Sequence, residues 1–118
     1  MKQNNEPTLR GYDAYKARLQ AGENVSFRES GNSMRPKILH RQECTYAPVK
    51  GHEDIKVGDA VWCKVGGRHF THLVTAKKSV GENNFSYQIS NNHGHINGWC
   101  GIETIFGKVV AIEGDPCK

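Results

Sequence analysis

The clearest hydrophobic pattern in the chain is a pair of strand-like segments joined by two glycines. Residues 60–65, Ala-Val-Trp-Cys-Lys-Val, form an apolar run, and Gly66-Gly67 follows at the spacing of a two-residue hairpin turn. In the returning segment 68–75, strand alternation places Phe70, His72 and Val74 on one face and His69, Thr71 and Leu73 on the other. The pattern therefore predicts an antiparallel hairpin over residues 60–75.

Shorter apolar runs predict further strands. They lie at residues 25–28, 44–49, 85–89 and 105–112. The last run is largely apolar, so we expect a central strand there, whereas Pro48 places the second run at a sheet edge or ends it. The polar stretch 77–84 is expected to be a turn region, and the glycine- and asparagine-rich stretch 90–98 a loop.

One segment shows helical spacing of its apolar residues. Between Thr8 and Ala21 these residues are Leu9, Tyr12, Tyr15 and Leu19. Gly11 costs about 1 kcal/mol inside a helix, so the predicted helix begins either at Thr8 or after Gly11. The predicted fold class is mostly β, with coiled antiparallel sheets and one N-terminal helix. We expect a lead and helix over 1–22, a β domain over 23–113 and a tail over 114–118.

Composition and charge narrow the function classes. A chain of 118 residues fits one domain, and thirteen glycines agree with many turns. The net charge is +4 and the positive residues are scattered along the sequence, so we expect no nucleic-acid partner. Trp62 lies in the strongest predicted strand, so we expect the aromatic residues to be in the core. We find no apolar run of about 18 residues and no signal-peptide core in residues 1–7, so we expect a soluble, cytoplasmic protein without a membrane span.

The cysteines and histidines do not predict a metal site. Four cysteines show no Cys-x-x-Cys spacing and are expected to be free thiols in a reducing compartment. His93 and His95 with Cys100, joined by Cys63 or His69, offer zinc-type ligands, but their spacing fits no standard pattern. We therefore predict no metal and no cofactor.

A serine turn follows the strand predicted at 25–28. The segment 30–36 reads Ser-Gly-Asn-Ser-Met-Arg-Pro. Gly31 can adopt a positive φ and Pro36 stiffens the end of the turn, which would aim a hydroxyl at a substrate with backbone N–H groups nearby. Taken alone, the pattern is more typical of an ordinary polar loop, because glycine, asparagine and serine are common turn residues.

Three motifs in order resemble the superfamily of type I signal peptidases and self-cleaving, LexA-like repressor peptidases. They are the serine turn at 30–36, Val-Gly-Asp-Ala-Val at 57–61 with its hairpin and Thr-His-Leu-Val at 71–74, and the region from Ser-Asn-Asn at 90–92 to Ile-Phe-Gly-Lys-Val at 105–109. The resemblance covers residues 25–112. It implies that Ser33 is a nucleophile, that His72 is its general base, and that the fold is a coiled antiparallel β structure.

The chain also departs from the signal-peptidase pattern. Gly31 stands where those enzymes usually carry a serine that helps to bind the oxyanion, which is more similar to the repressor type with backbone donors. The late loop has no acid between residues 90 and 101 to orient a histidine. Asn92 or Asn97 is the candidate for that role, with Asn92 as the first choice, since an asparagine orients the histidine in some cysteine peptidases.

These observations predict a small serine endopeptidase with a Ser33–His72 dyad. Neutral imidazole suits the role of base because its reference pKa is about 6.5. We expect a peptide or protein substrate to bind as an added strand, with contacts from Gly31, Asn32 and Met34. The alternative is a catalytically inactive module of the same fold that binds a partner protein, and the missing acid favours it.

Overall fold

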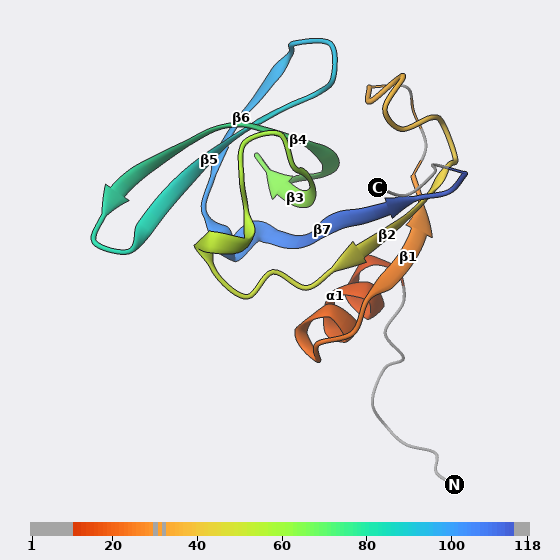
Figure 1. Cartoon of the computed structure of the whole chain (residues 1–118), viewed down its shortest axis with the longest axis horizontal. Coiled ribbons are helices and arrows are strands. Elements are labelled where there is room, and N and C mark those ends of the chain that lie inside the picture. The colour runs from red at the N-terminus through yellow and green to blue at the C-terminus, as the bar shows by residue number, and fades with distance from the viewer. Residues whose placement is uncertain (1–10, 30, 32, 115–118) are drawn as a thin grey trace, which may run out of the picture.

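The computed structural model describes residues 11–29, 31 and 33–114, and in this part of the chain seven strands form one antiparallel sheet (Figure 1). The elements in chain order are α1 (Tyr12–Gln20), β1 (Val25–Arg28), β2 (Glu43–Ala47), β3 (Ala60–Val65), β4 (Arg68–Gly81), β5 (Asn84–Ser90), β6 (Ile96–Cys100) and β7 (Ile105–Ile112), with short 3₁₀ turns at His52–Asp54 and Ile102–Thr104. The strand order is β1-β2-β7-β3-β4-β5-β6. The prediction of a mostly antiparallel β fold with one helix is confirmed.

The sheet carries a hydrophobic cluster on each face, and β3 contributes to both. Trp62 packs into one cluster with Tyr46 and with Leu19 of α1. Val61 and Cys63, its neighbours in β3, belong to the other cluster. This division follows from the two-residue period of a strand. The prediction that Trp62 is a core residue is confirmed, because its side chain has no exposed surface.

The predicted hairpin is present between β3 and β4. Val65 pairs with Arg68, which leaves Gly66 and Gly67 as a two-residue turn. Their φ angles of 58° and 82° are both positive, as a type I′ turn requires. The strand at 105–112 is central as predicted, because β7 lies between β2 and β3. Pro48 directly follows β2, which is one of the two alternatives predicted for it.

Two segments predicted as irregular are strands. β4 continues to Gly81 and pairs with β5, so the predicted turn region at 77–84 is wrong. The predicted loop at 90–98 is also wrong in part, because β6 begins at Ile96 and pairs with β5. The outer half of β4 is largely exposed and β6 lies at the edge of the sheet, so neither needs the apolar alternation of a core strand.

The helix begins at Tyr12, so of the two predicted starts the one after Gly11 holds. Gly11 adopts a φ of 56° just before the helix. Thr8 and Leu9, like most of the predicted lead and tail, lie outside the described residues. No helix within the described residues is both long enough and apolar enough to cross a membrane.

Candidate active site

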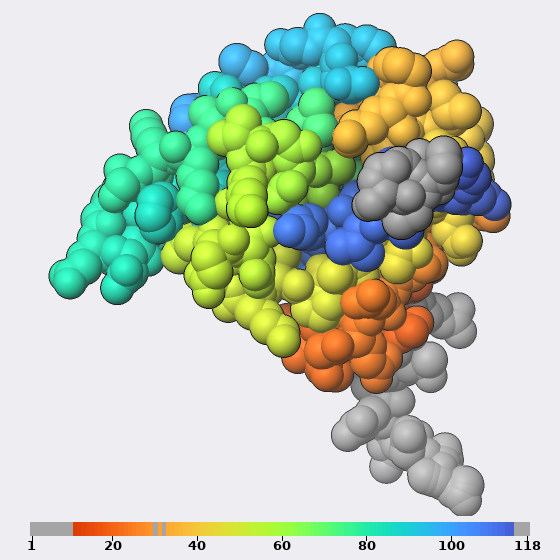
Figure 2. Space-filling model, in the orientation of Figure 1, coloured from red at the N-terminus to blue at the C-terminus, as the bar shows by residue number. Residues whose placement is uncertain are grey.

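The loop between β1 and β2 carries Ser33 and is held from two sides. Gly31 has a φ of 114°, and its N–H donates a hydrogen bond to His40 Nδ1 at 2.8 Å. On the other side, the Asn92 N–H donates to the Ser33 carbonyl oxygen at 2.9 Å. In Figure 2 the light-blue segment between β5 and β6 accordingly lies against the gold serine loop. Two segments far apart in sequence therefore fix the position of Ser33.

Ser33 and His72 lie in direct contact. The Ser33 Oγ is 2.9 Å from His72 Nε2, within hydrogen-bond distance. His72 projects from β4 and its side chain is only 5% exposed. The Phe70 ring stacks on the His72 ring with centroids 4.6 Å apart, as expected for alternate residues on one strand face. Phe70 was not among the predicted site residues, although its two-residue spacing from His72 was the available signal.

The partner of the second ring nitrogen is Asn97. Its Oδ1 lies 2.6 Å from His72 Nδ1. The first-choice assignment of Asn92 to this role is therefore wrong, and the alternative residue makes the contact. The Asn92 side-chain amide instead donates to the carbonyl oxygens of Met34 and Arg35, at 3.3 and 3.0 Å. The Asn92 side chain thus forms hydrogen bonds with the serine loop, while Asn97 in β6 contacts the imidazole.

The two contacts of His72 define its proton arrangement. The Asn97 carbonyl oxygen can only accept, so the ring proton sits on Nδ1 and the lone pair of Nε2 faces Ser33. Burial lowers the pKa of His72 below its usual value; the hydrogen bond that His72 Nδ1 donates to Asn97 opposes this shift, and nearby His95 adds to it. A lowered pKa keeps the imidazole neutral near pH 7, the state in which it can accept a proton.

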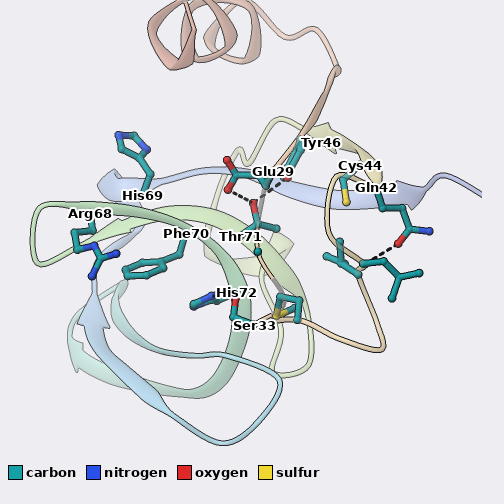
Figure 3. A pocket seen from close by; sticks show the side chains of 14 residues that line it. Glu29, Ser33, Gln42, Cys44, Tyr46, Arg68, His69, Phe70, Thr71 and His72 are labelled. Atoms are coloured by element: carbon teal, nitrogen blue, oxygen red, sulfur yellow. Dashed lines mark hydrogen bonds between the residues drawn. The ribbon is translucent and has the colours of Figure 1, made fainter.

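A cavity of about 320 Å³ opens beside Ser33 and His72 (Figure 3). It runs along β4 from His72 towards Arg68 and is bounded on the opposite side by residues of the β1–β2 connection. Gly31 and Met34, predicted to contact a substrate, are among the lining residues, and Asn32 lies outside the described residues. Tyr46 and Thr71 also line it, and their hydroxyls form a buried hydrogen bond of 2.9 Å.

The strand beside this cavity has an open edge. β3 pairs with one edge of β4 from Arg68 to Leu73. β5 pairs with the other edge only from Leu73 onward, so no strand in the described part of the chain pairs with that edge at residues 68–72. An unpaired edge presents free backbone donors and acceptors to another extended chain.

The hydrogen bonds on the β3 side of β4 show which backbone groups point to the open edge. At Val74 the N–H donates to Asp59 and the carbonyl accepts from Gly58, both at 2.8 Å, so both groups face the β3 side. In an antiparallel ladder this direction recurs at every second residue. The N–H and C=O groups of His69 and Thr71, two residues that line the cavity, therefore point away from β3, to the unpaired edge of β4.

Within residues 11–29, 31 and 33–114, no three His, Cys, Asp or Glu side chains come together as metal ligands. In the same ranges the cysteines, Cys44, Cys63 and Cys100, are free thiols. Comparisons with protein-family models, with curated proteins and with solved structures found no match to this chain.

Proposed function

We propose that the chain is a serine endopeptidase in which Ser33 is the nucleophile, His72 the general base and Asn97 the residue that orients the imidazole. The single observation that carries the proposal is the relay from Ser33 Oγ through His72 to Asn97, with contacts of 2.9 and 2.6 Å. A hydroxyl becomes a useful nucleophile when an oriented base takes its proton. The two contacts support this role for His72, because they place one ring nitrogen at the Ser33 hydroxyl and the other at the Asn97 oxygen.

In the proposed reaction, His72 Nε2 takes the Ser33 proton while Oγ attacks the carbonyl carbon of the scissile peptide bond. The carbonyl oxygen becomes an oxyanion, for which the Ser33 backbone N–H is a candidate donor, since none of the described residues accepts a hydrogen bond from it. The imidazolium then gives its proton to the leaving amine as the C–N bond breaks. A water molecule, activated by the same imidazole, hydrolyses the acyl-enzyme and restores Ser33.

The open edge of β4 supports an extended peptide as the substrate. A peptide paired with the backbone groups of His69 and Thr71 would run along the cavity towards Ser33. Main-chain hydrogen bonds of this kind hold a peptide with its carbonyl groups at fixed positions. This is the positioning that attack by a stationary hydroxyl needs.

The proposal is tested by labelling and by cleavage. We expect wild-type protein to react with a fluorophosphonate, which forms a covalent bond with activated serines, and to cleave members of a proteome-derived peptide library. Ser33→Ala is expected to abolish both labelling and cleavage. Ser79→Ala, a matched change on the exposed half of β4, is expected to abolish neither. Circular dichroism and thermal unfolding establish that each variant is folded. A wild-type protein that is neither labelled nor active, or a folded Ser33→Ala variant that still cleaves, would contradict the proposal.

A further inference from the structure

The cavity beside Ser33 contains a carboxylate that has no charged partner. Glu29 directly follows β1 and lines the cavity together with Ser33 and His72 (Figure 3). One carboxylate oxygen accepts a hydrogen bond from the Tyr12 hydroxyl, and the other accepts one from the Thr71 hydroxyl at 3.5 Å. Both donors are neutral, and a carboxylate has further acceptor positions beyond these two.

No cation within the described ranges neutralises Glu29. The ion pairs there join Arg18 to Glu23, Arg28 to Glu113 and Lys108 to Asp59. Arg68, the cation that lines the same cavity, has its guanidinium carbon 5.5 Å from the centre of the Phe70 ring. A half-buried carboxylate in a cavity is stabilised when a positive ligand supplies the missing charge.

The walls around Glu29 suit the stem of a long basic side chain. The apolar residues that line the cavity on the side of the β1–β2 connection are Met34, Ile38, Leu39 and Cys44. Lysine and arginine side chains place their methylene groups on apolar surface and their charged heads against polar partners. A cavity whose lining holds both these apolar side chains and a carboxylate matches this division along one side chain.

The proposed binding mode places such a side chain on the face of the sheet from which Thr71 contacts Glu29. Thr71 shares its face with Tyr46, with which it forms a hydrogen bond, and its hydroxyl contacts Glu29. Residues opposite one another on paired strands project to the same face. A substrate residue paired beside Thr71 therefore directs its side chain towards Glu29, whereas its neighbours in the substrate face the side of His72 and Phe70.

We propose that Glu29 is a specificity residue that binds a lysine or arginine side chain of the peptide substrate near the scissile bond. The inference rests on the proposed function, because it treats the bound peptide as a substrate. A measurement of peptide binding without cleavage also tests it. The Glu29 carboxylate contributes to substrate recognition and takes no part in the proton transfer between Ser33 and His72. A metal ion is not the proposed occupant, because no group of three metal-ligating side chains is present in the described part of the chain.

The test compares cleavage profiles over a proteome-derived peptide library, read by mass spectrometry. We expect wild-type cleavage sites to be enriched in lysine or arginine at one position, and Glu29→Gln to reduce that enrichment about tenfold. The amide of this variant keeps the shape of the side chain and an oxygen that accepts from Tyr12 or Thr71. Glu82→Gln, at the exposed turn between β4 and β5, is the matched control and is expected to keep the wild-type profile.

A binding measurement separates this inference from the proposed function. Arrayed peptides that differ only by lysine, arginine, glutamate or leucine at one position are probed with Ser33→Ala and with Ser33→Ala combined with Glu29→Gln. Stronger retention of the basic peptides by the first variant alone supports the inference even when wild-type protein cleaves nothing. Cleavage without a basic preference, a preference that survives Glu29→Gln, or an absence of both cleavage and charge-dependent binding would overturn it.

Discussion

Asn97 and His72 are joined by a contact of 2.6 Å that determines which ring nitrogen faces Ser33. The two residues come from different strands, β6 and β4. Because the Asn97 oxygen holds the proton of His72 on Nδ1, the unprotonated Nε2 is directed to Ser33. In the proposed mechanism, the Asn97 amide orients the imidazole as the carboxylate of a Ser-His-Asp triad does, without the negative charge.

Removing the Asn97 amide should therefore slow cleavage through the tautomer and orientation of His72. For Asn97→Ala we expect kcat/KM to fall roughly 10- to 1,000-fold with the protein still folded. Asn97→Asp places a negative charge beside the ring and should raise the pKa of His72, moving the acidic limb of the pH–rate profile up by about one unit or more. Steady-state kinetics from pH 5 to 9 measure both effects.

Asn92→Ala is the matched control for this experiment. The Asn92 amide supports the serine loop through Met34 and Arg35, so its loss should lower stability by about 1–2 kcal/mol and weaken activity. It does not contact His72, so the acidic limb should stay in place. A shift of that limb in Asn92→Ala equal to the shift in Asn97→Asp would contradict the assignment of Asn97.

The wild-type pH profile follows from the lowered pKa of His72. Burial disfavours the imidazolium, so the neutral base persists to a lower pH than for an exposed histidine. Activity should rise with pH through a midpoint below the reference value of about 6.5 and then level off. The profile of kcat/KM gives this midpoint for the free protein. A midpoint clearly above 6.5 would show that another group, or a charged partner of His72, controls the reaction.

Local patterns in the sequence predicted the central strands, whereas the Ser33–His72 pair came from a resemblance that spans most of the chain. The hairpin at 60–75 depends on alternation and on two glycines, both of which act over short distances. Ser33 and His72 emerged from the order of three motifs rather than from local chemistry. The structure brings these two residues into contact, although 39 positions separate them.

Long-range relationships were the part that sequence could not supply. The choice between Asn92 and Asn97 depends on how the pairing of β6 with β5 places Asn97 beside His72, and β6 lacks the alternation that would identify it as a strand. Glu29 carries no local signal, because its environment depends on Tyr12 in α1 and Thr71 in β4. Such contacts become visible only when segments distant in sequence are placed side by side.

The β3–β4 turn gives a prediction on stability. Gly67 has a φ of 82°, where a β-branched side chain is strained, so Gly67→Val should lower the free energy of unfolding by about 1–2 kcal/mol. Gly66→Asn should be nearly neutral, because asparagine tolerates the left-handed conformation with a φ of 58° found there. Urea unfolding of both variants provides the comparison. Equal stability of the two would mean that the turn is not type I′ in solution.

The cysteines are expected to differ in reactivity towards an alkylating agent. A hydrogen bond from the Cys63 thiol lowers the pKa of Cys100 to about 7, and the same contact raises the pKa of Cys63. Burial raises the pKa of Cys44 to about 11. Because the thiolate is the reactive form, iodoacetamide at pH 7.5 should modify Cys100 faster than Cys63 or Cys44.

Cys63→Ala provides the control, since it removes the donor while changing little volume. In this variant the pKa of Cys100 should return towards its ordinary value, and its alkylation at pH 7.5 should slow several-fold, whereas the rate at pH 9.5 should change much less. Digestion followed by mass spectrometry resolves each cysteine, including Cys117, by its own peptide. Faster modification of Cys44 than of Cys100, or a Cys100 rate unaffected by Cys63→Ala, would show that the thiol pair does not form as the structure has it.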